Sequence, residues 1–162
     1  MIRILALLCG IGLAVLASQL PEFSQQYRQR LGGAIDALEE VKRAFMQDAQ
    51  FLNLSVNEAF VYMSRSPDGF IRKRGESVAS ALERLEALKK QRADMNGAKP
   101  FERIWLFLRA PDIALSKATL HNFEPALPIT IEGIISAGLG FILGFFTIRF
   151  LGLISRRTKT SR

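Results

Sequence analysis

Apolar residues gather at both ends of the chain, and the middle is polar with a helical period. Residues 4–20 (ILALLCGIGLAVLASQL) contain no charged side chain, and neither do residues 133–148 (GIISAGLGFILGFFTI). A helix of about 20 residues crosses the roughly 30 Å hydrocarbon core of a bilayer. A helix also satisfies its own backbone groups there. The pattern therefore predicts two transmembrane helices, over residues 1–20 and 128–154.

Between these spans, apolar residues recur in steps of three and four, the period of an amphipathic helix. The first stripe is Phe23, Tyr27, Leu31, Ala34, Leu38, Val41, Phe45, Ala49 and Leu52. The second is Ile71, Gly75, Val78, Leu82, Leu85 and Leu88. On the polar faces, Glu39 with Arg43 and Glu86 with Lys90 have the i,i+4 spacing of helix-stabilising ion pairs. Two long helices are predicted.

Capping and breaking residues divide the middle further. Ser55 and Glu58 match a capping box that opens a short helix to about Ser64. Ser66-Pro67 predicts the start of the second long helix, with serine as the cap and proline in the first helical position. Asn96-Gly97 predicts its end, because glycine is favoured just past a helix terminus.

Four prolines shape the rest of the middle region. Pro100 and Pro111 predict two short helices, over 101–109 and to about residue 122, and Pro125 and Pro128 predict an extended elbow. The predicted fold is all-α, with two transmembrane helices flanking an antiparallel helical hairpin or small bundle. Its parts are transmembrane helix 1 (1–20), an extracytoplasmic helical region (21–127), transmembrane helix 2 (128–154) and a basic tail (155–162).

The net charge of +7 is uneven. Residues 21–127 hold 16 basic and 14 acidic side chains, whereas residues 128–162 hold five basic side chains and one acidic one. Basic residues beside a span mark the cytoplasmic side of a membrane. Both termini are therefore predicted to be cytoplasmic, with the middle in the periplasm and the spans in a bacterial inner membrane. The near balance of charge in the middle argues against nucleic-acid binding.

Charged residues near the predicted span ends are expected at the membrane interface, where their heads can reach water. These residues are Arg3, Glu132, Arg149, Arg156 and Arg157.

Small residues recur in both apolar segments at a spacing that lets membrane helices approach closely. In the first segment they are Ala6, Gly10, Ala14 and Ser18, and in the second Gly133, Ala137, Gly140 and Gly144. We predict that these are helix-packing positions, against the alternative that they are chance features of apolar helices. The same pattern favours retention of the first span over a signal peptide cleaved after Val15-Leu16-Ala17, because a discarded peptide needs no packing face.

Candidate chemistry is sparse. Cys9 is the only cysteine and His121 the only histidine, so no zinc site is predicted. The chain contains no nucleophile elbow, phosphate-binding loop or metalloprotease motif. We predict no catalytic, cofactor-binding or metal-binding residue, and no enzyme activity. His121 near Glu124 has the composition of a proton relay, but a polar residue at a helix end is the simpler interpretation.

Two further features each have two interpretations. The run Arg72-Lys73-Arg74 beside Arg65 suits either an anionic ligand or a solvated helix face. The segment 101–109 is apolar around its circumference, which predicts that Trp105 is either buried in the helical bundle or placed at the membrane interface.

The residues at both span junctions resemble those of a known family. ASQLPEF at 17–23 with QYRQRLGGA at 26–34 carries the resemblance at the first junction. NFEPALP at 122–128, leading into Glu132-Gly133, carries it at the second. The chain resembles, over nearly its full length, an uncharacterised proteobacterial family of two-span inner-membrane proteins with a domain of unknown function. The resemblance implies the architecture and no chemistry.

The sequence thus predicts a non-enzymatic inner-membrane protein whose helical periplasmic region is an interaction or scaffold module. Its expected partners are the lipid bilayer and either further copies of itself or a larger membrane complex. No nucleic acid or known small molecule is expected. The alternative is a ligand-sensing accessory subunit of a signalling or transport complex. The roughly eight residues after the second span are too few for an output domain, so such a subunit would need a partner.

Overall fold

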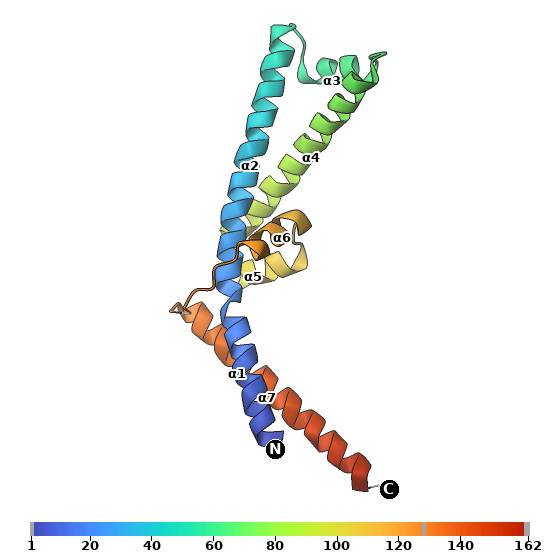
Figure 1. Cartoon of the computed structure of the whole chain (residues 1–162). Helices are drawn as coiled ribbons and strands as arrows, with labels where there is room; N and C mark the ends of the chain where they lie inside the picture. Colours follow the sequence, from blue (N-terminus) through green and yellow to red (C-terminus); the bar gives the residue numbers. More distant parts are fainter. Residues whose placement is uncertain (1, 128, 161–162) are drawn as a thin grey trace. The chain divides into compact units, whose positions relative to one another are not determined.

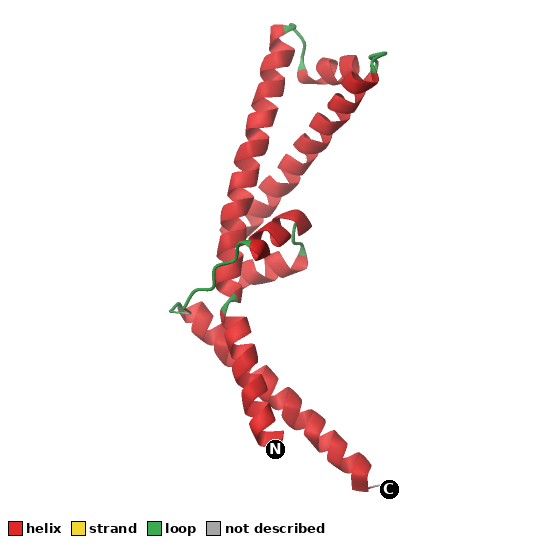
Figure 2. Ribbon diagram, viewed as in Figure 1, coloured by secondary structure: helices red, strands yellow, loops and turns green. Residues whose placement is uncertain are grey.

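A computed structural model describes residues 2–127 and 129–160, and the side chains of 153–160 lie outside that description. Seven helices are assigned within the described residues, and none of these residues forms a strand (Figure 2). The helices are α1 (Ile2–Ser18), α2 (Leu20–Phe51), α3 (Val56–Ser64), α4 (Gly69–Gly97), α5 (Pro100–Arg109), α6 (Ile113–His121) and α7 (Ile131–Thr160). The all-α prediction is confirmed. The predicted elbow proline, Pro128, lies outside the described residues.

The chain forms two compact units. One contains the residues up to Tyr27 together with those from Ala98 onward, and the other is Arg28–Gly97. This grouping divides the predicted extracytoplasmic region 21–127, because residues 21–27 and 98–127 belong to the unit that contains α1 and α7. The helix α7 also runs to Thr160, past the predicted end of the second span at 154.

A single residue separates α1 from α2. The Gln19 N–H donates to the Leu16 carbonyl oxygen at 3.2 Å, a tight turn, and the Phe23 N–H then donates to the Gln19 carbonyl oxygen at 2.9 Å. Pro21 falls in the first turn of α2, where its missing N–H has no intrahelical partner to lose. The chain therefore restarts as a helix at this point, and α2 then continues through Gly32-Gly33 without a break.

In the unit Arg28–Gly97, α2 and α4 run in opposite directions and α3 lies between their ends (Figure 1). Burial of Gly75, Val78, Leu85 and Leu88 confirms most of the predicted stripe of α4. In α2 the pattern is less regular. Ile35, outside the predicted stripe, is buried.

The position of α3 between the end of α2 and the start of α4 accounts for the less regular burial along α2. The Phe45 ring of α2 lies 4.6 Å from the Phe60 ring of α3, measured between centroids. On the other side of α3, a Cβ added at Gly75 would lie 3.0 Å from the Cβ of Met63. The far part of α2 therefore packs on α3, and Leu52 at its end stays exposed.

Ion pairs join α2 to α4. The Lys89 ammonium lies 2.8 Å from the Glu39 carboxylate, and the Lys42 ammonium lies 3.7 Å from that of Glu86. The hydrogen bond from Lys89 is the main cause that lowers the pKa of Glu39, and the nearby charge of Arg43 contributes less. Each glutamate thus has an ion pair across the two helices that the sequence did not predict, because antiparallel packing brings a lysine from the other helix within reach.

Helices α3 and α4 each begin where a side chain caps the first backbone N–H groups. At α3 the Glu58 N–H donates to the Ser55 hydroxyl at 3.3 Å and the Ser55 N–H donates to the Glu58 carboxylate at 2.8 Å, which confirms the capping box. The predicted start of α4 at Ser66-Pro67 was two residues early. The Asp68 carboxylate accepts from the Phe70 N–H at 2.8 Å and so caps the helix.

Candidate functional site: the paired apolar helices

Two helical stretches are long and apolar enough to cross a membrane. One is the N-terminal stretch that contains α1, and the other is Ile131–Gly152 of α7. In each of them, only 17% of an apolar 18-residue segment is buried. The core helix of a soluble protein buries most of its residues, so the environment of these two helices differs from such a core.

The two helices place small residues between them and large apolar residues outside. Ala6, Gly10 and Ser18 of α1 are buried, as are Gly133, Gly140 and Gly144 of α7, while Ala14 and Ala137 are half-buried. The exposed side chains are large and apolar, and include Ile4, Leu5, Leu8, Leu16, Ile142, Leu143, Phe146 and Phe150. This distribution is the reverse of a soluble core, where large apolar side chains are the ones buried.

Glycine allows the backbones of α1 and α7 to touch. A Cβ added at Gly140 would collide with the Leu13 carbonyl oxygen and lie 2.7 Å from the Cβ of Ala17. A Cβ added at Gly144 would lie 2.7 Å from the Cys9 carbonyl oxygen. No side chain larger than hydrogen fits at these two positions without moving a backbone.

The order of these contacts gives the direction of the helices. Cys9 and Gly10 face residues 141–144, Leu13 faces Gly140, and Ile2 faces Gly152. Residue numbers rise along one helix as they fall along the other, so α1 and α7 are antiparallel. Their free ends lie at the same end of the pair (Figure 1).

Sequence reasoning missed some residues of this contact. Ser136 is buried on α7, one turn before Gly140. Its small side chain would have allowed the sequence to predict it as a packing position. The Phe141 ring packs over Gly10, at 3.0 Å from the position of an added Cβ. Nothing in the sequence distinguishes this phenylalanine from its exposed neighbours, because only the rotation of α7 against α1 decides which residue faces inward.

The residues predicted to lie at the membrane interface differ in exposure. Arg3 is exposed, and Glu132 and Arg149 are half-buried near the two ends of the apolar part of α7. The side chains of Arg156 and Arg157 lie outside the described residues.

Two glutamines fasten the extended segment before α7 to the start of α2. The Gln19 amide donates to the Ala126 carbonyl oxygen at 3.1 Å and accepts from the Ala126 N–H at 3.2 Å. The Gln26 amide makes the same pair of bonds with Glu124, at 3.0 and 3.4 Å. An extended segment makes no helical hydrogen bonds within itself, so its backbone groups need other partners. Here the two glutamine side chains supply them, as a neighbouring strand would in a sheet.

Aromatic rings hold α5 against the same part of α2. The Phe107 ring lies 5.3 Å from that of Phe23 and 4.9 Å from that of Tyr27, between centroids. Tyr27 is fully buried, and its hydroxyl accepts from the Asp112 N–H at 3.0 Å. Trp105 is 65% exposed, which contradicts burial in the bundle, the first of its two predicted placements, and leaves the membrane interface as the other. The residue that α5 buries is Ile104, one position earlier.

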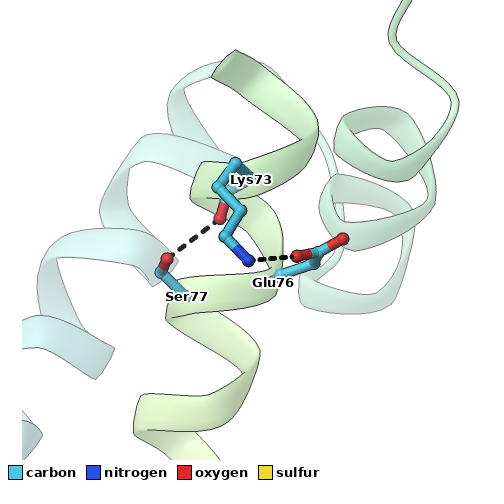
Figure 3. A network of polar contacts seen from close by, with 3 residues as sticks. All are labelled: Lys73, Glu76 and Ser77. Atoms are coloured by element: carbon cyan, nitrogen blue, oxygen red, sulfur yellow. Dashed lines mark hydrogen bonds and ion pairs between the residues drawn. The ribbon is translucent and has the colours of Figure 1, made fainter. Parts of the chain in front are cut away.

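The basic run on α4 makes local contacts. The Lys73 ammonium pairs with the Glu76 carboxylate at 2.9 Å, and the Ser77 hydroxyl donates to the Lys73 carbonyl oxygen (Figure 3). Arg72 donates to the carbonyl oxygens of Ser66 and Pro67 at 2.8 and 3.0 Å. These contacts of Arg72 and Lys73 stay within α4 and the turn before it, whereas Arg74 of the same run lines a cavity.

His121 is exposed, and its Nδ1 lies 2.7 Å from the side-chain oxygen of Asn122. Among the described residues, no three His, Cys, Asp or Glu side chains lie close enough to hold a metal ion.

An apolar cavity of about 330 Å³ lies where α3 separates α2 from α4. Its lining is mainly aliphatic and aromatic, with Asp48 and Arg74 as the charged members. The apolar lining residues are Val41, Ala44, Phe45, Ala49, Leu52, Leu54, Ala59, Met63 and Val78. Sequence reasoning did not find this cavity, because Val41, Phe45, Ala49, Leu52 and Val78 of its lining belong to stripes that were expected to pack against each other.

Comparison with known proteins identifies a family. A family model described as "Protein of unknown function (DUF2937)" matches residues 1–160. No curated protein and no solved structure matches the chain. The predicted resemblance to an uncharacterised family is confirmed by this nearly full-length match.

Proposed function

The chain belongs to the DUF2937 family of proteins of unknown function, and from this premise we propose that it is a non-enzymatic scaffold of the bacterial inner membrane. In this proposal α1 and α7 form a transmembrane pair, and the helical unit Arg28–Gly97 binds a protein partner in the periplasm. Both termini are cytoplasmic.

The observation that carries the membrane assignment is the reversed packing of α1 and α7. Lipid tails are as apolar as leucine, so exposed large side chains cost nothing in a bilayer, and close packing of small residues becomes the main attraction between helices. In water the same surface would expose many apolar side chains next to one another, which soluble monomers avoid. The packing of α1 on α7 also supports retention of α1, since a cleaved signal peptide makes no such contact.

Reporter fusions test the topology. A reporter that is active only outside the cytoplasm is expected to work when inserted at Asn96, and one that is active only inside is expected to work after Arg162. The physical reason is the antiparallel pair, which returns the chain to its starting side, together with the basic residues that follow α7. The opposite pattern of activity would refute the orientation. A mature protein beginning at Ser18 would refute retention of α1.

The scaffold role is supported by apolar side chains at the end of the hairpin where α3 lies. Phe51 at the end of α2 is 86% exposed, and Phe70 at the start of α4 is 78% exposed. Tyr62 and Leu52 nearby are also exposed. Several exposed apolar side chains at one end of a helical unit are typical of a protein interaction site.

Photo-crosslinking in cells tests this role. A photoreactive amino acid at Phe51 or Phe70 is expected to form discrete adducts with one partner protein, identified by mass spectrometry. The same amino acid at Ser80, an exposed polar position of α4, is the control and is expected to form few adducts. Equal adduct patterns at all three positions would contradict a docking surface at the hairpin end.

A second candidate function is ligand sensing, which the cavity beside α3 favours. Its apolar lining with Arg74 suits a small amphiphile with an anionic group. A small molecule retained by the protein purified from membranes, and lost on Arg74→Glu, would favour sensing over scaffolding.

A further inference from the structure

We propose that one face of α5, formed by Phe101, Trp105 and Leu108, lies in the interfacial layer of the bilayer beside the spans. This inference rests on the proposed membrane location and adds a second, non-spanning contact with lipid. It makes α5 a helix that lies on the membrane and holds the start of α2 at a fixed height above it.

The three residues form a continuous face. They are spaced i, i+4 and i+7, which places them on one side of a helix. Their exposed fractions are 43%, 65% and 54%. Ile104 and Phe107 project from the neighbouring side of α5, where Ile104 is buried and Phe107 packs on Phe23 and Tyr27. Thus α5 uses one apolar side for the protein and leaves a second one uncovered.

The contacts of α5 fix its height above the spans. Phe23 and Tyr27 lie four and eight residues after Gln19, where α1 gives way to α2. At 1.5 Å per residue these positions are about 6 and 12 Å beyond that point along the helix. The headgroup layer is about 5–8 Å thick on each side of the hydrocarbon core. A helix has a radius of about 5–6 Å with its side chains. With the end of α1 placed at the edge of the hydrocarbon core, as the proposed transmembrane pair requires, α5 reaches into the headgroup layer.

The chemistry of α5 and α6 fits that layer better than it fits water or hydrocarbon. Tryptophan is enriched at membrane interfaces because its ring is apolar and its N–H is polar. Lys99 precedes α5, Arg109 is its last residue and Lys117 lies on α6, and all three are exposed. Together with the exposed Glu102 they give this part of the chain a net positive exposed charge, which suits the phosphate groups of lipids. Ile113 and Leu120, seven residues apart on one side of α6, are exposed apolar residues as well. The occupant that this combination fits is a lipid headgroup layer.

Tryptophan fluorescence tests the proposal, because Trp105 is the only tryptophan in the chain. The full-length protein is reconstituted in vesicles of phosphatidylcholine and phosphatidylglycerol, and co-flotation with the vesicles is checked first. We expect blue-shifted emission from Trp105 and loss of most of its quenching by iodide. We also expect strong quenching when the lipids carry bromine near the headgroup end of their acyl chains.

A variant with the tryptophan moved to another exposed aromatic position is the matched control. In Trp105→Phe combined with Phe70→Trp, emission is expected at longer wavelength, with strong quenching by iodide and little by brominated lipid. Iodide quenching of Trp105 in a protein that floats with the vesicles would overturn the inference and leave the membrane assignment intact. Shielding of Trp105 from both quenchers would also overturn it, because a protein surface would then cover the face. Failure to float would overturn the proposed membrane location itself.

Discussion

Replacing Gly140 and Gly144 together by leucine is expected to separate α1 from α7 while leaving insertion into the membrane intact. Each new side chain would meet a backbone carbonyl of α1, that of Leu13 or that of Cys9, and a backbone cannot rotate away as a side chain can. Over-packing of a close contact costs about 1–3 kcal/mol per site. The lost contact is the main attraction between these helices, so we expect loss of the pair in most molecules.

The measurement is disulfide crosslinking between Cys9, the native cysteine of α1, and a cysteine placed on α7 at Phe141. An added Cβ at Gly144 would lie 2.7 Å from the Cys9 carbonyl oxygen, and one at Gly10 would lie 3.0 Å from the Phe141 ring, so positions 9 and 141 lie on facing turns of the intact pair. The double leucine variant is expected to abolish the crosslink. The matched control is Gly138→Leu, on the same helix, where an added Cβ would meet nothing within 4 Å. Equal crosslinking in the two variants would show that the glycine face does not hold the pair.

Truncation of Tyr27 to alanine is expected to release α5 from α2. Tyr27 is fully buried, packs its ring on Phe107 and accepts a hydrogen bond from the Asp112 N–H at the start of α6. Truncating a buried aromatic side chain costs about 3–5 kcal/mol. The loss is expected to appear as faster hydrogen exchange and faster proteolysis across α5 and α6. Tyr27→Phe removes only the hydroxyl and is expected to cost about 1 kcal/mol, the usual net value of one hydrogen bond.

The other tyrosine of the chain provides the control. Tyr62 is 64% exposed, so Tyr62→Ala is expected to change stability by no more than about 0.5 kcal/mol. If the two alanine variants exchanged equally fast across α5 and α6, the buried ring of Tyr27 would not be what fastens these helices.

The residues that predicted the fold were those whose effect is local. The charge-free segments, the capping box of Ser55 with Glu58 and the glycine after Asn96 each act within a few residues, and the structure places helices accordingly. Helix starts shifted where two caps compete. At α4 the Asp68 carboxylate caps the helix in place of Ser66, because an aspartate side chain reaches the N–H two residues on.

The candidate site was predictable in its composition and not in its geometry. Small residues at every third or fourth position show that one side of a helix carries only small side chains, and the sequence alone therefore located Gly10, Gly140 and Gly144. It did not show that the Gly140 and Gly144 backbone meets the carbonyls of Leu13 and Cys9. That register depends on how far α7 slides and turns against α1, which no local pattern encodes.

By itself, the sequence determined that the chain is helical, where its apolar segments lie and which positions are small enough for close packing. These properties depend on the side chains of a single helix and on its 3.6-residue period. Only the tertiary structure decided the partner of each face. It pairs Glu39 with Lys89 across two helices, holds residues 122–127 with the Gln19 and Gln26 amides, and turns Trp105 outward while Ile104 is buried. Such choices depend on contacts between residues far apart in the chain, since neighbouring positions on one helix are equally apolar and only packing distinguishes them.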